Sequence, residues 1–387
     1  MKKDIKVGIV IFVIIGIVIC FLLKSVLAKP EPHDYVKVTY LPIYKSWHAE
    51  DVQGNLLTDV NLAFASITSD SKIRVDPIDE LDLSKELISL KLKYPHLKIN
   101  LSVGGWGSDG FSDMALTKET RSVFIESAVS ALESYDLDGI DIDWEYPTQD
   151  HSGKTRTRPE DTQNFILLMS EMRAKFDEIY KINHKKYKLT FAAPMSDWAV
   201  EAFGVHEASN SVDYIYLMGY DYIGKWSSIT GHHSNWFEHK DSPVHLNTYD
   251  GIKRYLSACS PEKLVVGLPA YGYGWKGVAS ADNGLFQNSS EGISPDDRDL
   301  SYSSLKEEYT SENGYIRYWD DISKAAYLYN GDIWITYEDL EAVEFKANAV
   351  KTLGLGGMMY WESTHDKTGD IIRTISDVLD KRENSSF

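Results

Sequence analysis

The chain has 387 residues, of which 43% are hydrophobic and 25% are charged, a composition typical of a globular protein rather than a disordered or fibrous one. Its formal net charge of −18 argues against nucleic acids and anionic lipid surfaces as partners, because like charges repel. The two cysteines, Cys20 and Cys259, are too few for a disulfide framework.

The N-terminal segment has the pattern of a targeting signal. Residues 1–6 are net basic, and Val7–Leu23 contains no charged residue. A basic start before an apolar run is typical of a signal peptide, and a run of about 17 residues also reaches the lower limit for crossing a bilayer. We expect residues 1–28 to be a signal peptide or an N-terminal membrane anchor, followed by a linker over residues 29–34. Either interpretation predicts an extracellular protein, secreted or anchored to the outer face of the membrane.

Downstream of the linker, short apolar runs alternate with amphipathic stretches such as Thr117–Tyr135 and Asp161–Tyr180. The runs are rich in β-branched and aromatic residues, which predicts strands. The predicted strands are Val36–Leu41, Val60–Ile67, Leu97–Val103, Gly139–Trp144, Leu189–Ala193, Tyr214–Met218, Leu264–Pro269 and Gly357–Trp361. Alternating strands and helices predict an α/β fold, a (β/α)8 TIM barrel over residues 35–380 with a tail over 381–387. An open doubly wound sheet is less favoured, because no glycine-rich ligand loop follows the first strand.

The interval between the last two predicted strands is too long for one helical connection. It contains a helix-like segment, YSSLKEEYTS, and two strand-like segments, GYIRYWDD and DIWITYED. A loop of this length without structure of its own is uncommon. We therefore expect residues 271–344 to form a small α+β insertion between strand 7 and strand 8, on the catalytic face of the barrel.

Acidic side chains are concentrated in Asp138–Pro147, with the sequence DGIDIDWEYP. Alternate side chains of a strand share a face, so Asp141, Asp143 and Glu145 are expected to face the barrel axis. Active sites of such barrels lie at the carboxyl ends of the strands. Repulsion between three close carboxylates raises at least one pKa, which suits a general acid for glycosidic bond cleavage. Glu145 reaches furthest and is the best candidate. Acidic clusters also bind Mg²⁺ or Ca²⁺, and this alternative is weaker.

Several motifs resemble glycoside hydrolase family 18, the chitinase family. DGIDIDWE resembles the family signature Asp-Gly-x-Asp-x-Asp-x-Glu. The other matching segments are SVGGW (Ser102–Trp106), MGYD (Met218–Asp221), KLVVGLPAYGYGW (Lys263–Trp275) and GLGGMMYW (Gly354–Trp361). Tyr40 falls at the position of a first-strand tyrosine of the family. The long interval is similar to the insertion of its deep-groove chitinases. One departure is Tyr273, at a position where the family often has arginine.

The resemblance implies a retaining, substrate-assisted reaction on β-1,4-linked N-acetylglucosamine polymers, with no metal and no cofactor, in which the substrate's own N-acetyl oxygen attacks the anomeric carbon. Glu145 would donate the proton, Asp143 would orient the acetamido group, and Asp141 would share a proton with Asp143. Tyr220 would hydrogen-bond the acetamido oxygen. The implied substrate-binding and supporting residues are Asp221, Trp361, Met218, Trp106, Tyr40 and Ser102. Tyr40 and Ser102 could equally be satisfied core hydroxyls.

Other functions remain open at this point. An endo-β-N-acetylglucosaminidase or a peptidoglycan hydrolase of the same family would use the same residues, and the insertion favours a long linear chain instead. A catalytically weak chitin-binding lectin is a further alternative, and the intact Glu145 argues against it. We expect the protein to act as a monomer on an oligosaccharide or polysaccharide.

Overall fold

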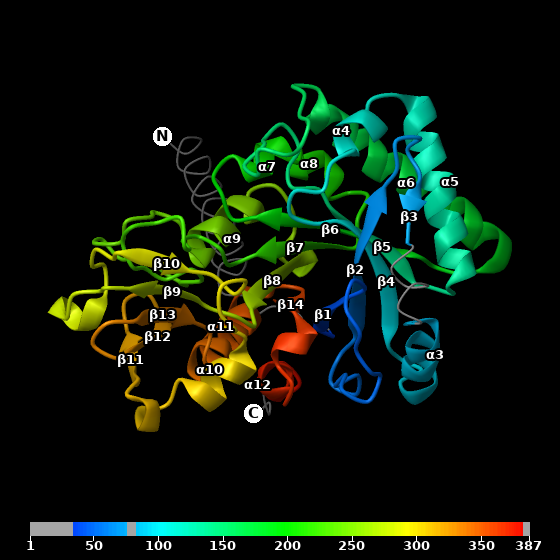
Figure 1. Cartoon of the computed structure of the whole chain (residues 1–387). Helices are drawn as coiled ribbons and strands as arrows, with labels where there is room; N and C mark the ends of the chain where they lie inside the picture. The colour runs from blue at the N-terminus through cyan, green and yellow to red at the C-terminus, as the bar shows by residue number, and fades with distance from the viewer. Residues whose placement is uncertain (1–33, 76–82, 382–387) are drawn as a thin grey trace, which may run out of the picture.

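The computed structural model describes residues 34–75 and 83–381. Parallel strands in this part of the chain close into a barrel, because β1 pairs with both β2 and β14. Around the ring the strands are β1 (Val36–Pro42), β2 (Asp59–Ile67), β4 (Lys98–Gly104), β5 (Gly139–Asp143), β6 (Lys188–Pro194), β7 (Tyr214–Met218), β8 (Leu264–Pro269) and β14 (Gly357–Trp361). Figure 1 shows helices packed around this ring. The predicted (β/α)8 TIM barrel is confirmed, and each predicted strand overlaps one of these strands.

Helices cover the outside of the barrel between consecutive strands and after the last strand, β14. They are α3 (Leu83–Lys93), α4 (Phe111–Met114), α5 (Lys118–Ser134), α6 (Asp161–Asn183), α7 (Ala199–Ala202), α8 (Val205–Ala208), α9 (Thr248–Leu256), η1 (Pro261–Lys263), α11 (Leu340–Leu353), η4 (Ser363–His365) and α12 (Asp370–Leu379). The apolar face of α6 is buried as its periodicity predicts, with Phe165, Leu168 and Met172 in the main core. A short strand, β3 (Ile73–Arg74), extends β2 in antiparallel register and was not predicted.

Burial on both faces explains why the barrel strands are almost continuously apolar. Every residue of β1 is buried. Val36, Val38 and Tyr40 belong to a small cluster inside the barrel, whereas Leu41 belongs to the large cluster between strands and helices. The alternation of these two clusters along a strand decides which side chains reach the barrel axis.

A second sheet lies between β8 and α11 in the chain. Its order is β10 (Glu291–Ile293), β9 (Tyr273–Lys276), β13 (Trp334–Tyr337), β12 (Ala325–Tyr329) and β11 (Ile316–Asp320), and its short helices are η2 (Ala281–Gly284), α10 (Tyr302–Glu308) and η3 (Ser311–Asn313). Figure 1 shows this sheet to one side of the barrel. The domain boundaries drawn from the sequence stay predictions, and residue 344, the predicted end of the insertion, falls inside α11.

The predicted signal peptide or anchor lies outside the described residues, as does most of the predicted tail. Within residues 34–75 and 83–381, no helix combines the length and hydrophobicity needed to span a bilayer.

Candidate active site

Strand β5 presents its acidic side chains to the barrel interior. Ile140, Ile142 and Trp144 pack outward in the main core, where the Trp144 ring stacks on Phe111 at 5.3 Å. The alternate residues Asp141 and Asp143 are buried on the other side. β5 ends at Asp143, so Glu145 lies just beyond the strand and is 9% exposed.

Three hydroxyl groups surround Asp141. Tyr40 Oη and Ser102 Oγ donate to Asp141 Oδ2 at 3.0 and 2.7 Å, and Thr190 Oγ1 donates to Oδ1 at 2.7 Å. These donors come from β1, β4 and β6, so the carboxylate ties three strands to β5. The motifs indicated Tyr40 and Ser102 but not Thr190, because a single threonine inside a buried strand carries no sequence signal.

Asp143 differs from Asp141 in its hydrogen bonding. Both oxygens of Asp141 accept from hydroxyl groups, whereas Asp143 Oδ1 is buried without a hydrogen-bond partner among the described residues. Burial raises the pKa of Asp143 well above its usual value, and the charges of Glu145 and Asp141 raise it further. A carboxyl group in this position favours the protonated form or a shared proton.

Glu145 has the pKa that a general acid needs. Burial raises its pKa to about 7, a hydrogen bond with Tyr146 opposes the shift, and the charge of Asp221 adds to it. Burial also raises the pKa of Asp141, while its three hydroxyl donors lower it. Burial is therefore the largest cause for all three acids, ahead of the mutual repulsion that the sequence suggested.

The backbone at the end of β4 fits closely against β5. Gly104 has a φ of 121°, and a Cβ atom there would lie 2.1 Å from the Asp143 carbonyl oxygen. The next residue, Gly105, donates its N–H to the same oxygen at 3.0 Å. The glycine pair of the SVGG motif therefore holds the end of β5 at a distance that a side chain would prevent.

Tyr220 and Asp221 form another wall of the site, directly after β7. The charges of Asp221, Asp143, Glu145 and Asp141 all act on the Tyr220 hydroxyl, whose pKa burial raises well above its usual value. Asp221 adopts a left-handed backbone conformation with φ 61°. Tyr271 donates to Asp221 Oδ1 at 2.6 Å, and Tyr273 also hydrogen-bonds this carboxylate.

Tyr273 therefore contacts Asp221 at the position where the family often has arginine. Neither tyrosine was predicted to contact Asp221, although both lie in the family-like segment AYGYGW. His233 Nδ1 lies 3.7 Å from Asp221 Oδ1 and carried no sequence signal.

Aromatic rings gather inside the barrel around Tyr40, the residue that donates to Asp141. Trp361 stacks on Phe64 at 5.3 Å with an interplanar angle of 12°, and its ring lies 5.3 Å from that of Tyr40. Met218 packs against the same interior cluster. A flat, partly exposed ring in this position can stack on the C–H face of a sugar.

Trp106 lies apart from these rings, with 60% of its surface exposed. Its ring lies 6.3 Å from that of Tyr146, the residue that hydrogen-bonds Glu145. Tyr146 was not predicted as a site residue. Of the predicted residues, the barrel thus brings the acids together with Tyr40, Ser102 and Tyr220, while Trp106 reaches them through Tyr146.

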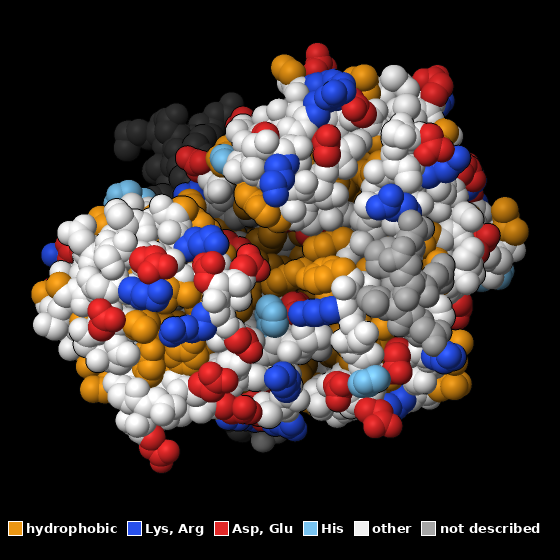
Figure 2. All heavy atoms as spheres, viewed as in Figure 1, with side chains coloured by type: hydrophobic (Ala, Val, Ile, Leu, Met, Phe, Trp, Pro, Cys, Tyr) orange, Lys and Arg blue, Asp and Glu red, His pale blue; other side chains and the backbone are white. Residues whose placement is uncertain are grey.

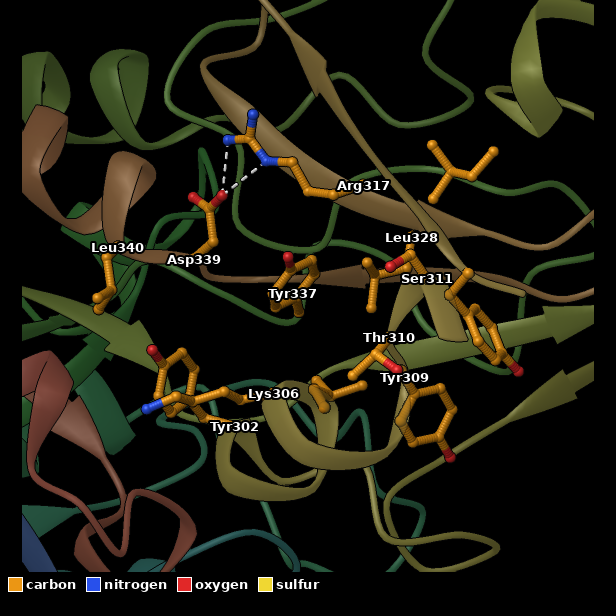
Figure 3. Close-up of a pocket in the computed structure, with 13 residues that line it drawn as sticks. Tyr302, Lys306, Tyr309, Thr310, Ser311, Arg317, Leu328, Tyr337, Asp339 and Leu340 are labelled. Carbon is orange, nitrogen blue, oxygen red and sulfur yellow. Dashed lines mark hydrogen bonds and ion pairs between the residues drawn. The ribbon is translucent and has the colours of Figure 1, made fainter. Parts of the chain in front are cut away.

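The molecular surface is hollowed on the face shown in Figure 2, where hydrophobic side chains line the hollow and charged side chains gather at its rim. A separate cavity of about 460 Å³ lies in the second sheet, between α10 and β11. Figure 3 shows Tyr302, Tyr309 and Tyr337 around it, with Arg317 paired to Asp339 at one side. None of the predicted site residues lines this cavity. The described residues contain no cluster of His, Cys, Asp and Glu arranged to hold a metal ion.

Several known proteins are similar to this chain. Chitinase A1 of Niallia circulans is 38% identical over 330 residues, covering 82% of this chain and 46% of that protein. Endochitinase of Manduca sexta is 32% identical, covering 83% of this chain and 61% of that protein. The chain thus spans roughly half the length of these relatives.

Among solved structures, a family 18 N-acetylglucosaminidase from Paenibacillus barengoltzii is 33% identical with a TM-score of 0.81, covering 89% of this chain and 100% of that one. The sequence profile of Glycosyl hydrolases family 18 matches residues 38–366. The chain therefore belongs to glycosyl hydrolase family 18.

Proposed function

We propose that the protein is a retaining glycoside hydrolase that cleaves β-1,4-linked N-acetylglucosamine polymers, chitin or its oligosaccharides, by substrate-assisted catalysis. The observation that carries the proposal is the buried acid Glu145 beside Asp143, whose burial raises its pKa to about 7, so that about half of it still carries its proton at neutral pH. The chitinases among its relatives support the choice of substrate.

In the proposed reaction, Glu145 protonates the leaving oxygen while the acetamido oxygen of the same sugar attacks the anomeric carbon. The C–O bond to the leaving group breaks as the oxazoline ring closes. Asp143 accepts the acetamido N–H and stabilises the positive charge of the ring, and Tyr220 donates its hydroxyl to the acetamido oxygen. Glu145 then removes a proton from water, which opens the ring and restores the acid.

Asp221 and Trp361 hold the reacting sugar in this mechanism. Trp361 stacks beneath the ring, and Asp221 contacts a hydroxyl from the side. Asp141 stays behind Asp143 and does not contact the sugar, because its oxygens already accept from hydroxyl donors. In this mechanism it shares a proton with Asp143.

The configuration of the first product tests this proposal. Proton NMR of a fresh chitohexaose digest is expected to show the β-anomer before mutarotation, and the fully deacetylated hexamer is expected to remain intact. Early α-anomer, or equal cleavage of the deacetylated hexamer, would contradict substrate assistance. N-glycoprotein and peptidoglycan, assayed beside chitohexaose, separate the chitinase from its alternatives within the family.

A second candidate is the release of N-acetylglucosamine from short oligosaccharides. The similarity to the Paenibacillus barengoltzii enzyme, which this chain covers completely, favours it. Product sizes from chitohexaose decide between the two: dimers and trimers indicate internal cleavage, and monomer from the first minutes indicates release from an end.

We also propose that the enzyme works outside the cytoplasm as a monomer. The basic start and apolar run of residues 1–28 support export. Cell fractionation with N-terminal sequencing tests this: mature protein beginning near residue 29 indicates cleavage, an intact N-terminus in the membrane fraction indicates an anchor, and cytoplasmic protein contradicts the proposal. Sedimentation of the purified protein tests the monomer.

A further inference from the structure

A buried lysine on α11 occupies the junction between the barrel and the second sheet. The side chain of Lys346 is 1% exposed, and its ammonium group pairs with Glu338, which is 2% exposed and directly follows β13. The same ammonium donates to Ser234 twice, to the carbonyl oxygen at 2.6 Å and to Oγ at 2.8 Å. Lys346 therefore joins α11, the end of β13 and the long loop that follows β7.

Ser234 continues this chain of hydrogen bonds toward the site. Because its Oγ accepts from the ammonium, its own proton is free to point elsewhere, and Oγ donates to the carbonyl oxygen of Gly219 at 2.7 Å. Gly219 immediately precedes Tyr220 and Asp221. A Cβ atom at Gly219 would lie 2.6 Å from the carbonyl oxygen of Gly267, so this backbone is already packed against β8.

A parallel set of contacts holds the other end of the same short segment. Tyr222 donates its N–H to the carbonyl oxygen of His233 at 3.1 Å. His233 in turn donates its own N–H to Thr336 Oγ1, on β13, at 3.3 Å. The backbone from Gly219 to Tyr222 is therefore held on both sides by residues 233 and 234, which are themselves held by the second sheet and α11.

The segment needs such support for a physical reason. Asp221 has φ 61°, a conformation that non-glycine residues rarely adopt and that persists where surrounding contacts hold it. The described residues between β7 and α9 contain no long helix or strand to stabilise this backbone. A buried ion pair is by itself a weak source of stability, because two charges lose their hydration. This makes a role in fixing a conformation a better explanation of the Lys346–Glu338 pair than stability alone.

We propose that Lys346, anchored by Glu338, is a positioning residue that acts through Ser234 and the Gly219 carbonyl to hold Tyr220 and Asp221 in their reactive geometry. This inference rests on the proposed function, because it concerns the groups that would contact the acetamido group and the sugar. Through Glu338 and Thr336, the second sheet then becomes part of the support of the catalytic centre.

Ser234→Ala is the sharpest variant, because it removes the link to Gly219 and leaves the Lys346–Glu338 pair intact. We expect kcat on chitotetraose to fall about tenfold, since small displacements of positioned groups have effects of this order or larger. Affinity for the thiazoline analogue of N-acetylglucosamine, which mimics the cyclised intermediate, is expected to fall in parallel. KM and affinity for chitobiose are expected to change less than kcat, because stacking on Trp361 is untouched and only the contact with Asp221 is disturbed.

The matched control is Ser227→Ala, in the same loop but outside this network, where Ser227 Oγ donates to the Ile229 carbonyl oxygen at 2.8 Å. Both variants are measured well below their melting temperatures. A purely structural role would lower the melting temperature of Ser234→Ala and leave kcat and thiazoline affinity at the level of Ser227→Ala, and that result would overturn the proposal.

A second variant tests Lys346 itself. Lys346→Met combined with Glu338→Leu removes both charges together and leaves neither one buried alone. We expect the same loss of kcat as in Ser234→Ala, and kcat equal to that of the unmodified enzyme would overturn the role of Lys346. If the unmodified enzyme itself does not cleave chitotetraose, the proposed function fails; if it does and the variants match it, only this inference fails.

Discussion

Buried carboxylates lie at both ends of the barrel, and they differ in whether a cation is paired with them. Asp59 opens β2 and is 1% exposed, and its carboxylate pairs with the Lys188 ammonium while accepting from Asn100 at 3.2 Å and Thr58 at 2.8 Å. Asp141, Asp143 and Glu145 are buried at the other end. No lysine or arginine of the described residues contributes to the pKa of these three.

This difference separates a carboxylate that joins strands from one to which the proposed mechanism assigns proton transfer. Burial disfavours the charged form in both places. A cation offsets that cost at the amino ends of the strands, where Lys188 begins β6. At the carboxyl ends burial raises the pKa values of the three acids, which in the proposed mechanism keeps a proton available.

The largest expected effect is the loss of the acid itself. Glu145→Gln keeps the shape of the side chain but cannot donate a proton to the leaving oxygen, so kcat on chitohexaose should fall by roughly 10³-fold. Isothermal titration calorimetry should show oligosaccharide binding within about fivefold of the original. Turnover close to that of the unmodified enzyme would remove Glu145 from the mechanism.

The opposite end of the barrel should respond in stability and not in activity. Lys188→Met leaves Asp59 buried without its cation, and the free energy of unfolding in urea should fall by about 3 kcal/mol. The kcat of the folded variant should stay unchanged. Lys186→Met is the control, because this side chain is 73% exposed and lies 3.9 Å from Asp213, and it should cost at most about 0.5 kcal/mol. A change of the pH optimum in Lys188→Met would contradict the view that Asp59 affects stability and not activity.

The raised pKa of Glu145 predicts two pH effects of intermediate size. Activity should fall as pH rises through about 7, because the acid must be protonated to act. The native state also holds this proton to a higher pH than the unfolded chain, so stability decreases as pH rises from about 4.5 to 7. Glu145→Gln removes that penalty and should raise the free energy of unfolding at pH 8 by about 3 kcal/mol, with little change at pH 4. Equal stability of both proteins at pH 8 would contradict the assignment.

The smallest expected effect concerns the hydroxyl groups around Asp141. Thr190→Val removes one donor from Oδ1, which should raise the pKa of Asp141 further and reduce kcat about fivefold, in line with one hydrogen bond. The control is Thr39→Val, also buried in a barrel strand, whose hydroxyl lies 3.4 Å from the Tyr360 carbonyl oxygen. Equal kcat values for the two variants would show that hydroxyl support of Asp141 is dispensable.

The sequence predicts the barrel well because its strands are local features. Each is a short apolar run with clear ends, and Tyr214–Met218, Leu264–Pro269 and Gly357–Trp361 match the structure at both ends. The inward direction of the acidic side chains could be predicted for the same reason, because alternation along β5 is a property of consecutive residues. The strand ends at Asp143 rather than Trp144, so Glu145 lies in a bend just beyond it.

The missed contributors share the opposite property, because their partners are distant in sequence. Thr190 contacts Asp141 across 49 positions, and Lys346 contacts Ser234 across 112. No periodicity or composition signals such a pair. Tyr273 could be flagged only as a departure from a family pattern, and its contact with Asp221 required three-dimensional geometry.

The place of the second sheet in the chain has a consequence for protein engineering. The sheet leaves the barrel after β8 and the chain returns as β14, and these two strands are hydrogen-bonded neighbours, with Pro269 opposite Trp361. A unit whose entry and exit adjoin can be exchanged for a longer or shorter one without altering the order of β1 to β7. Such a graft would have to carry its own counterparts of Thr336 and Glu338, or the transplanted groove would be built around a misaligned Asp221.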